Sequence, residues 1–511
     1  MQLKDHISTE VLIFGTGIAG NAVALELASK KIRTTMVTKA EDIDESNTKY
    51  AQGGVIYKGK GDPELLMEDI LQAGANFSNY NAVKILAKNG PAIIEKILIK
   101  KLGIKFTKDN NGNIHLIKEA AHSCKRIIHI KDCTGKIIEE AFVKDLKRNK
   151  FIKFYTNTTL IDLIIIKNKS KRYCVGAYIL DNNKNEIKTI FAKKVILATG
   201  GVGKLYSRTA NSGVATGDGL AAAFRAGAKI KNAEFIQFHP TSLYSKNNSG
   251  FLISEALRGE GAQLKNQNGD NFVEKYDKRG GLAPRDIVTR AIFWELTKSR
   301  KDYVLLDARS IQKEKIKNHF SNIYKTCLKN GIDITKEPIP VAPTAHYFCG
   351  GIKVDTRGRT NIKNLFAIGE TSCTGVHGAN RLASTSLLEC LVWGTRAAKD
   401  ISVNINKLQI KNINASYLKY PIRNGAINLE NDRNLLKNIM WSCVGIIRSK
   451  KNLLEALQKI SFLHKKAKKI IKGGVNKDII NFYNSAQAAL IITKAALNNK
   501  QSRGCHYLDK Q

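Results

Sequence analysis

Residues 10–28 read Glu10-Val-Leu-Ile-Phe-Gly15-Thr-Gly17-Ile-Ala-Gly20-Asn-Ala-Val-Ala-Leu-Glu-Leu-Ala28. The apolar run before Gly15 predicts a buried strand, and the run rich in alanine and leucine after Gly20 predicts a helix. A strand, a Gly-x-Gly-x-x-Gly turn and a helix form the fingerprint of a dinucleotide-binding unit. In that unit Gly15 makes the turn, Gly17 lets a pyrophosphate approach the backbone, and Gly20 lets the helix pack on the strand.

The next predicted strand departs from this fingerprint at its end. Residues 34–37 are followed by Thr38 and Lys39, where a dinucleotide site would carry an Asp or Glu for a ribose hydroxyl. Another acid must therefore bind the ribose, or the unit is not a simple NAD site.

Two later segments favour a flavin over a nicotinamide. Residues 194–201 and 360–370 are apolar strand patterns that end in glycine, and Asp218 lies between them in Thr-Gly-Asp-Gly. These are further places where backbone can approach a nucleotide. Their wide spacing predicts a nucleotide domain that is interrupted by an insertion near residues 236–348.

Basic and histidine side chains indicate a pocket for a small dicarboxylate. Arg381 lies in a turn rich in Gly, Ser and Thr that leads into an apolar helical pattern, and a helix start is a natural anion site. Its guanidinium can bind a carboxylate through two hydrogen bonds. Arg285 follows a Gly-Gly-Leu-Ala-Pro turn, and His239 and His346 occur in Phe-His-Pro-Thr and Ala-His-Tyr.

As a set, these motifs resemble the succinate dehydrogenase/fumarate reductase flavoprotein family. The matching segments, in chain order, are 51–54, 218–219, 239–241, 255–261, 283–286, 346–347 and 377–381. In the succinate dehydrogenases of that family, a histidine five residues before the glutamine of Ala-Gln-Gly-Gly carries FAD covalently. Asn47 stands at that position here, so the resemblance implies FAD that is bound noncovalently.

The resemblance also assigns roles residue by residue. It implies that FAD is bound by Gly15, Thr16, Gly17, Ile18, Ala19, Gly20, Lys39, Asn47, Thr48, Lys49, Tyr50, Ala51, Gln52, Gly53, Gly54, Asp218, Glu370, Ser386 and Leu387. It implies that the substrate is bound by Glu119, His239, Ser254, Glu255, His346 and Arg381. Arg285 would be the catalytic proton donor or acceptor. Because a free guanidinium has a pKa above ~12, that role needs a relay with Glu255 or with Arg258 and Glu260.

Glu119 separates two branches of this family. Residues 116–127 resemble the loop with which an aspartate-oxidising branch places a carboxylate against the substrate ammonium. Aspartate differs from succinate by one cationic group, so a buried anion discriminates between them. Without the resemblance, an exposed helix glutamate would be the more common interpretation. The loop has Ala120 and Ala121 where the family has two glycines, Ser254 replaces a threonine, and Thr385 replaces an asparagine.

The implied reaction is FAD-dependent oxidation of L-aspartate to iminoaspartate, with oxygen or fumarate as electron acceptor. It would be the first step of de novo NAD biosynthesis towards quinolinate, with hand-off to quinolinate synthase as a possible partnership. The alternative within the family is a soluble fumarate reductase or a succinate dehydrogenase flavoprotein subunit. A different class, a nucleic-acid-binding protein on a flavin scaffold, would be expected to have lost Arg285, Arg381 or His346, and all three are present.

Composition bears on partners and location. The formal net charge is +39, which would ordinarily favour a polyanionic partner. The lysines are spread along the chain beside Asn and Ile, a pattern typical of an AT-rich genome, so we expect no nucleic-acid partner. The nine cysteines show no zinc-type spacing, so no metal is expected. We also expect no membrane span and a cytoplasmic location.

The predicted fold class is α/β, with a Rossmann-like FAD-binding domain, an inserted α+β capping domain and a C-terminal helical bundle. The FAD-binding domain would comprise residues 1–238 and 349–410, the capping domain residues 239–348, and the helical domain residues 415–511. Residues 433–441 and 453–460 carry apolar side chains at three- and four-residue spacing, which predicts amphipathic helices in the last domain.

Overall fold

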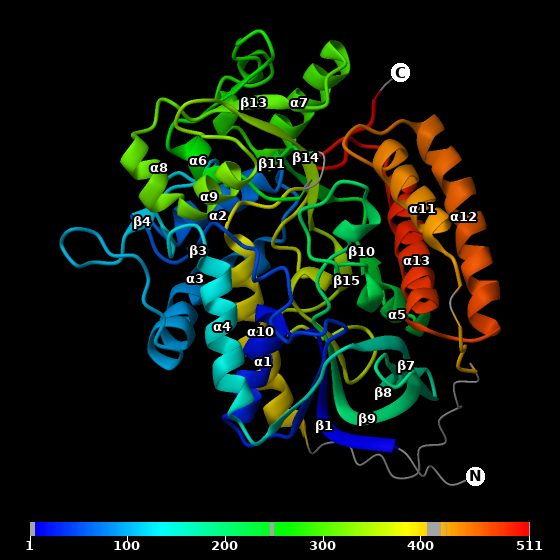
Figure 1. Ribbon diagram of the computed structural model, residues 1–511. Coiled ribbons are helices and arrows are strands. Elements are labelled where there is room, and N and C mark those ends of the chain that lie inside the picture. The colour runs from blue at the N-terminus through cyan, green and yellow to red at the C-terminus, as the bar shows by residue number, and fades with distance from the viewer. Residues whose placement is uncertain (1–5, 246–249, 406–420, 426, 510–511) are drawn as a thin grey trace.

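The computed structural model describes residues 6–245, 250–405, 421–425 and 427–509, and it is built around a seven-stranded sheet (Figure 1). The strand order is β6-β2-β1-β9-β8-β7, and β16 pairs with β9 beside this path. Its strands are β1 (His6–Phe14), β2 (Thr34–Val37), β6 (Ile152–Tyr155), β7 (Thr158–Asn168), β8 (Lys171–Asp181), β9 (Glu186–Leu197) and β16 (Leu365–Ala367). Strands β6, β2, β1, β9 and β16 pair in parallel, whereas β7 and β8 are antiparallel.

The turn between β1 and α1 (Ile18–Ala28) has the geometry that the glycine pattern predicts. Gly15 has a φ of +108°, and a Cβ built there would lie 2.1 Å from the carbonyl oxygen of Ala198. A Cβ at Gly20 would lie 2.1 Å from the carbonyl oxygen of Gly15, so only glycine lets the helix pack this closely on the turn. Helix α1 is apolar on all sides and almost wholly buried, with α10 (Thr385–Asn404) packed against it.

Other helices and short strands complete this part of the chain around α1, α10 and the large sheet. The helices are α2 (Glu64–Ala73), α3 (Tyr80–Ile94), α4 (Thr134–Lys147) and α5 (Asp218–Ala226). The short strands β3 (Val55–Ile56), β5 (Ile127–Ile128) and β4 (Leu116–Ile117) form one three-stranded sheet, and β10 (Ile230–Lys231), β15 (Gly351–Lys353) and β17 (Ser372–Cys373) form another.

A second unit stands above the large sheet in Figure 1. Its four-stranded sheet has the order β11-β14-β13-β12 and a separate apolar core. The strands are β11 (Ile236–Leu243), β12 (Gln263–Lys265), β13 (Val304–Asp307) and β14 (Ile339–Phe348), and the helices are α6 (Glu255–Gly259), α7 (Arg285–Ser299), α8 (Lys313–His319) and α9 (Ser321–Lys329). The capping-domain bounds 239–348 fall inside β11 and at the end of β14, and this division remains a prediction.

Three long helices form the C-terminal part: α11 (Glu430–Cys443), α12 (Lys450–Lys472) and α13 (Lys477–Asn498). They contain both segments that were predicted to be amphipathic helices, and α13 packs against α5 and β7 of the first unit. The predicted fold class is therefore confirmed. The domain limits at 410 and 415 fall outside the described residues.

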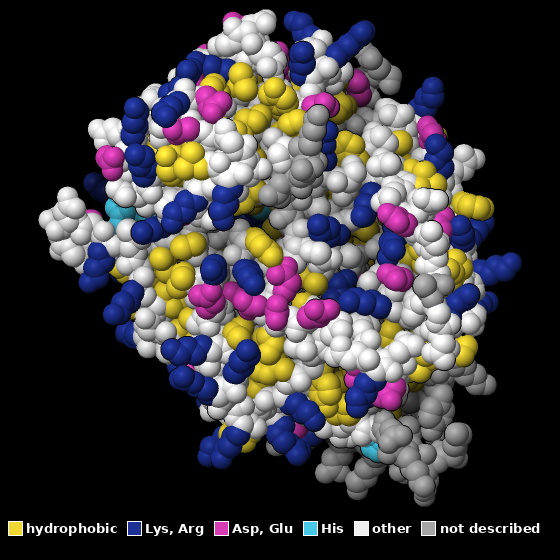
Figure 2. Space-filling view, viewed as in Figure 1, with side chains coloured by type: hydrophobic (Ala, Val, Ile, Leu, Met, Phe, Trp, Pro, Cys, Tyr) yellow, Lys and Arg dark blue, Asp and Glu magenta, His cyan; other side chains and the backbone are white. Residues whose placement is uncertain are grey.

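The surface carries many basic side chains. On the face shown in Figure 2, Lys and Arg side chains are scattered over the molecule and interspersed with apolar and acidic ones, rather than gathered into one patch. Among the helices that the structure describes, none is long and apolar enough to cross a membrane.

Candidate active site

Two adjoining cavities lie between the large sheet, the second unit and the start of α10. The first, of about 130 Å³, is lined by the turn after β1 and by the carboxyl ends of β2, β9 and β16. The second, of about 150 Å³, lies between that edge and the second unit. Ile18, Asn47, Thr48 and Glu370 line both cavities. Parallel strands place their ligands at this edge of a sheet, so the fold positions both cavities for a nucleotide and its reaction partner.

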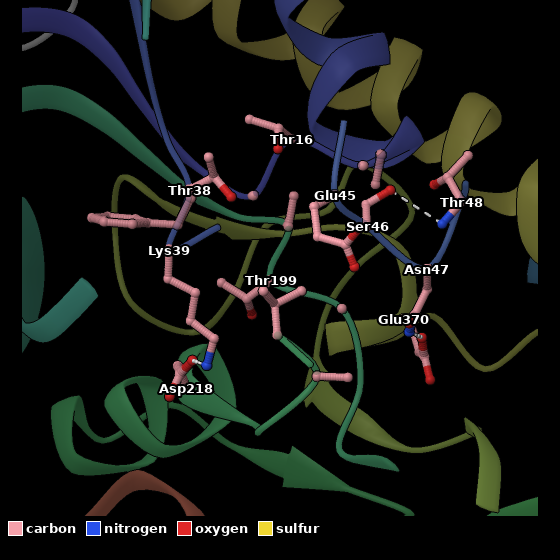
Figure 3. A pocket seen from close by; sticks show the side chains of 18 of the residues that line it. Thr16, Thr38, Lys39, Glu45, Ser46, Asn47, Thr48, Thr199, Asp218 and Glu370 are labelled. Carbon is pink, nitrogen blue, oxygen red and sulfur yellow. Dashed lines mark hydrogen bonds and ion pairs between the residues drawn. The ribbon is translucent and has the colours of Figure 1, made fainter. Parts of the chain in front are cut away.

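The N-terminus of α1 borders the first cavity (Figure 3). Gly17, Ile18 and Ala19 line it, and the Ile18 N–H donates to Thr48 Oγ1 at 3.0 Å. The backbone N–H groups at a helix start and the positive end of its dipole suit a pyrophosphate.

A buried ion pair closes the opposite side of the first cavity. Lys39 Nζ lies 2.6 Å from Asp218 Oδ2 and also contacts Thr216 Oγ1, and Figure 3 shows the lysine extended towards the aspartate. Asn484 Nδ2, from α13, donates to the other Asp218 oxygen at 3.1 Å. Asp218 therefore supplies a carboxylate at the end of β2, where the sequence has Lys39 in place of an acid.

Glu370 stands where the two cavities meet. Its Oε1 accepts from the backbone N–H of Phe348 at 2.9 Å, and Asn47 Nδ2 lies 3.5 Å from its Oε2. Burial raises the pKa of Glu370 to about 7. The side chain can thus donate or accept hydrogen bonds at neutral pH, which suits contacts with the hydroxyl groups of a cofactor.

The first cavity fits an FAD molecule by the chemistry of its lining. The helix start suits the pyrophosphate, and the carboxylates of Asp218 and Glu370 suit the hydroxyl groups of the cofactor. Apolar side chains such as Val37 and Leu160 suit an aromatic ring of the cofactor. Because a Cβ at Gly15 would collide with the strand beside it, the turn leaves backbone rather than side chain towards the cofactor.

The second cavity has an arginine at one wall. Arg381 Nη2 lies 3.0 Å from His346 Nε2, Nη1 donates to Ser386 Oγ at 3.1 Å, and the guanidinium stacks 4.4 Å from the ring centre of Tyr347. These three contacts fix the plane of the guanidinium, which prepares it to bind a carboxylate through two hydrogen bonds.

Both histidines of this cavity are neutral. Burial, together with the positive charge of Arg285 nearby, holds the pKa of His239 and of His346 well below the ordinary range. Because a guanidinium only donates, His346 Nε2 must accept from Arg381, which puts the ring proton on Nδ1. That buried Nδ1 has no hydrogen-bond partner among the described residues, so it is a spare donor for a substrate.

Arg285 begins α7 and is held by two partners. Its Nε lies 2.5 Å from Glu255 Oε2, and its Nη1 donates to Gln237 Oε1 at 3.1 Å. Burial raises the pKa of Glu255, but the charges of Arg285 and Arg258 outweigh burial and keep that pKa below the ordinary value. Ser254 precedes Glu255 as the N-cap of α6, and its Oγ accepts from the Ala256 N–H at 3.3 Å.

Glu119 adds a second carboxylate to the same cavity. Its side chain is 3% exposed, and the Ser384 hydroxyl donates to its Oε2 at 2.6 Å. Burial and the charge of Glu255 raise the pKa of Glu119 to about 6, so it is ionised at neutral pH. A Cβ at Gly53 would lie 2.5 Å from Glu119 Oε1, so this backbone also approaches the carboxylate closely.

The structure brings most of the predicted site residues together. All the predicted substrate residues and Arg285 line the second cavity, and the predicted cofactor residues line one cavity or both, with two exceptions. Gly20 packs under the turn, and Lys49 pairs with Asp44 at 3.1 Å and lines neither cavity.

Sequence reasoning missed several residues that complete these cavities. They are Glu45, Ser46, Thr199, Gln237, Tyr347, Ser384 and Asn484. Tyr347 belongs to one of the motifs, and Gln237 and Ser384 lie within three residues of others, so proximity to a motif was an available signal. Asn484 lies on an amphipathic helix far along the chain, and its sequence context carried no signal.

Known proteins resemble this chain along nearly its whole length. Residues 10–387 match the family described as FAD binding domain, and residues 433–510 match fumarate reductase flavoprotein C-term. An L-aspartate oxidase from Pseudomonas aeruginosa is 38% identical over 99% of this chain and 96% of that protein. A chloroplastic L-aspartate oxidase from Oryza sativa subsp. japonica is 38% identical over 98% of this chain and 81% of that one. Among solved structures, an E. coli quinol fumarate reductase superposes with a TM-score of 0.89 at 25% identity, covering 99% of this chain and 92% of that chain.

Proposed function

The chain belongs to the L-aspartate oxidase family of FAD-binding flavoproteins, and on this premise we propose how its two cavities carry out the family reaction. The protein oxidises L-aspartate to iminoaspartate with FAD as its cofactor. One feature supports aspartate above other dicarboxylates: the carboxylate of Glu119 lies in the same cavity as Arg285 and Arg381. A ligand with two anionic groups and one cationic group matches that arrangement of charges.

The roles of the residues follow from charge. Arg381 and the Nδ1–H of His346 bind one carboxylate of aspartate, and His239 and Ser254 bind the other. Glu119 pairs with the ammonium. Holding the substrate at these points fixes the α-carbon, and such orientation can contribute several kcal/mol, within the roughly 7–11 kcal/mol found in favourable cases.

Oxidation removes a hydride from the α-carbon and a proton from the ammonium, which leaves a C=N bond. When bound, FAD supplies the hydride acceptor. Arg285 is placed to relay this proton, because its guanidinium can give a proton to the ionised Glu255 as it takes one from the substrate amine. Glu255 also lies 3.6 Å from Arg258, so a chain of charged groups leads away from the cavity.

Two steps around this reaction belong to the same proposal. Fumarate presents two carboxylates, so the donors that hold aspartate also hold fumarate as an electron acceptor, and oxygen is the second acceptor. The oxidation is the first step of de novo NAD biosynthesis, and because imines hydrolyse readily in water, we propose that iminoaspartate passes from it to quinolinate synthase. A cytoplasmic location remains a prediction.

Anaerobic bleaching of the flavin absorbance tests this function. L-Aspartate should bleach the purified protein, whereas succinate at the same concentration should not. The variant E119Q should need at least about tenfold more aspartate for half-maximal bleaching, the order of one lost charge-assisted contact, and keep reduction of fumarate by the dithionite-reduced protein. Bleaching of the wild-type protein by succinate and not by aspartate would show the activity of a succinate dehydrogenase or fumarate reductase. A purified protein without yellow colour would contradict the FAD assignment.

A further inference from the structure

The segment that carries Glu119 folds over a buried arginine. Arg126 is fully buried, and its Nη2 lies 3.1 Å from Asp62 Oδ1 while its Nη1 contacts Asp69 Oδ2. Asp62 precedes α2 and Asp69 lies within that helix, and neither residue lines a cavity. The two carboxylates offset much of the cost of burying this cation, although Arg126 Nε and Asp62 Oδ1 have no hydrogen-bond partner among the described residues.

Asp69 binds the loop directly as well as through the arginine. It accepts from the backbone N–H of Ser123 at 2.8 Å and from the Ser123 hydroxyl. Asp62 instead accepts from the Gly59 N–H at 2.8 Å, outside the loop that carries Glu119. The two aspartates therefore share Arg126, but only Asp69 also binds Ser123, in the turn that follows Glu119.

From Arg126, a directed series of hydrogen bonds runs to the other side of Glu119. Arg126 Nη1 lies 3.4 Å from His122 Nδ1, and His122 Nε2 lies 3.1 Å from the carbonyl oxygen of Ala383. A guanidinium only donates and a carbonyl only accepts, so His122 must carry its proton on Nε2. Burial lowers the pKa of His122 to about 4, so the ring is neutral and keeps this tautomer at neutral pH.

Both ends of this arrangement lead to Glu119, one to its backbone and the other to its carboxylate. The backbone N–H of His122 donates to the backbone carbonyl oxygen of Glu119 at 3.2 Å. In the turn that this bond closes, Ala121 has a φ of +64°. Ala383 directly precedes Ser384, whose hydroxyl donates to Glu119 Oε2. Ala121 adopts a left-handed conformation that alanine seldom takes, so contacts around the turn must offset its strain.

We propose that Asp69, Arg126 and His122 are positioning residues that hold Glu119 for the ammonium of the substrate, and thereby set the preference for an amino acid over a dicarboxylate without an amino group. This inference rests on the proposed function. None of the three residues lines either cavity, so they act through Glu119 and Ser384.

Steady-state kinetics of D69N, with D62N as matched control, tests the inference on the purified holoenzyme. D69N should raise KM for aspartate about tenfold or more, the order of one lost charge-assisted contact, and leave KM for fumarate within about twofold. D62N removes the same charge from Arg126 but no contact to Ser123, so its KM for aspartate should change by less than about threefold. Equal increases for aspartate and fumarate in D69N, or equal effects of D62N and D69N, would overturn the inference.

A double-variant cycle separates positioning from general damage. In an E119Q background, D69N should add less than about twofold to KM for aspartate, because the group that it positions is already gone. Fully additive losses would assign D69N a role unrelated to Glu119. If D69N does not fold, S123A removes one of the loop contacts and should raise KM for aspartate about threefold.

Hydrogen–deuterium exchange provides a readout that needs no aspartate turnover. Residues 119–126 should exchange at least about tenfold faster in D69N than in D62N, since opening the loop no longer breaks its two contacts to Asp69. Unchanged exchange would contradict the inference even if aspartate is the substrate. Faster exchange in a protein that aspartate does not bleach would support the positioning role and contradict only the proposed function.

Discussion

The ammonium group of Lys39 lies 2.6 Å from the carboxylate of Asp218, although 179 residues separate them in the chain. Lys39 follows β2, where dinucleotide sites place a ribose-binding acid. Asp218 opens α5 and brings a carboxylate to the same end of the first cavity. We therefore infer that a distant element supplies the acid that the motif lacks, and Asn484 of the helical C-terminal part donates to it.

This pair predicts a defect in FAD binding. D218N keeps the shape of the side chain but leaves the Lys39 charge without its partner. We expect the dissociation constant of FAD to rise about 30-fold, equivalent to about 2 kcal/mol. Fluorescence titration of the apoprotein with FAD measures it. D162N is the matched control, because Asp162 pairs with Arg225 at 2.7 Å and lines neither cavity. A similar loss of affinity in D162N would refute the specific role.

Because Asn47 stands where a histidine would carry FAD covalently, we predict that FAD is released on denaturation. Its amide oxygen accepts from the Ser212 N–H at 2.9 Å and its nitrogen faces Glu370, and no amide forms the flavin linkage that a histidine forms. Acid precipitation of the yellow holoenzyme should leave nearly all flavin in the supernatant, as measured by its absorbance. Flavin that stays in the protein pellet would show a covalent bond at another residue.

Much of the fold was predictable because local pattern and tertiary structure agree. The run before Gly15 is short and apolar, the run after Gly20 is longer and rich in alanine and leucine, and each matches the element that forms. The helices α11 and α12 were predictable for the same reason, since each buries one face and exposes the other.

The rest of the site depends on contacts that leave no periodic signal. The pairs Lys39–Asp218 and Glu119–Ser384 join residues that are far apart in sequence, and their partners are chosen by packing. Ser384 also has a φ of +57°, a conformation that its residue type does not announce. Resemblance to a family could name Glu119, but only the structure could show what holds it.

We predict from the contacts of Arg381 that a lysine at this position cannot bind the substrate carboxylate equally well. R381K keeps a positive charge but loses the planar fork, the stack on Tyr347 and one of the two side-chain contacts. We expect kcat/KM for aspartate and for fumarate each to fall about 100-fold, equivalent to about 3 kcal/mol. Parallel assays with both substrates check this. A loss confined to aspartate would contradict the assignment of Arg381 to a carboxylate.

Arg285 predicts a defect in the chemical step. R285Q keeps a hydrogen-bonding side chain but removes the proton-transfer group, and it leaves Glu255 with Arg258 as its charged partner. We expect anaerobic flavin reduction by aspartate to slow about 100-fold or more, as for removal of a general acid or base. The aspartate concentration at half-saturation should change much less. Stopped-flow absorbance separates the two quantities, and an effect on saturation alone would reassign Arg285 to substrate binding.

Titration of Glu119 should make the preference for aspartate over fumarate depend on pH. Its pKa of about 6 means that the carboxylate loses its charge as the pH falls through 6. Since only the ionised form attracts an ammonium, kcat/KM for aspartate should fall about tenfold per pH unit below 6. Fumarate has no ammonium, so its kcat/KM should show no such fall. His239 and His346 do not titrate near this pH, because their pKa values lie well below the ordinary range.

Ionisation of Glu119 favours binding of the ammonium but lowers the stability of the folded protein. Burial raises the pKa of Glu119 from 4.5 to about 6, so the folded protein holds this proton more tightly than the unfolded chain does. The associated stability, about 2 kcal/mol for such a shift, is present below pH 4.5 and is lost as the pH rises through 6. E119Q should therefore melt at a higher temperature than wild type at pH 8 and at a similar temperature near pH 4.5. It should also abolish the break near pH 6 in the aspartate profile, and a break that persists in E119Q must come from another group.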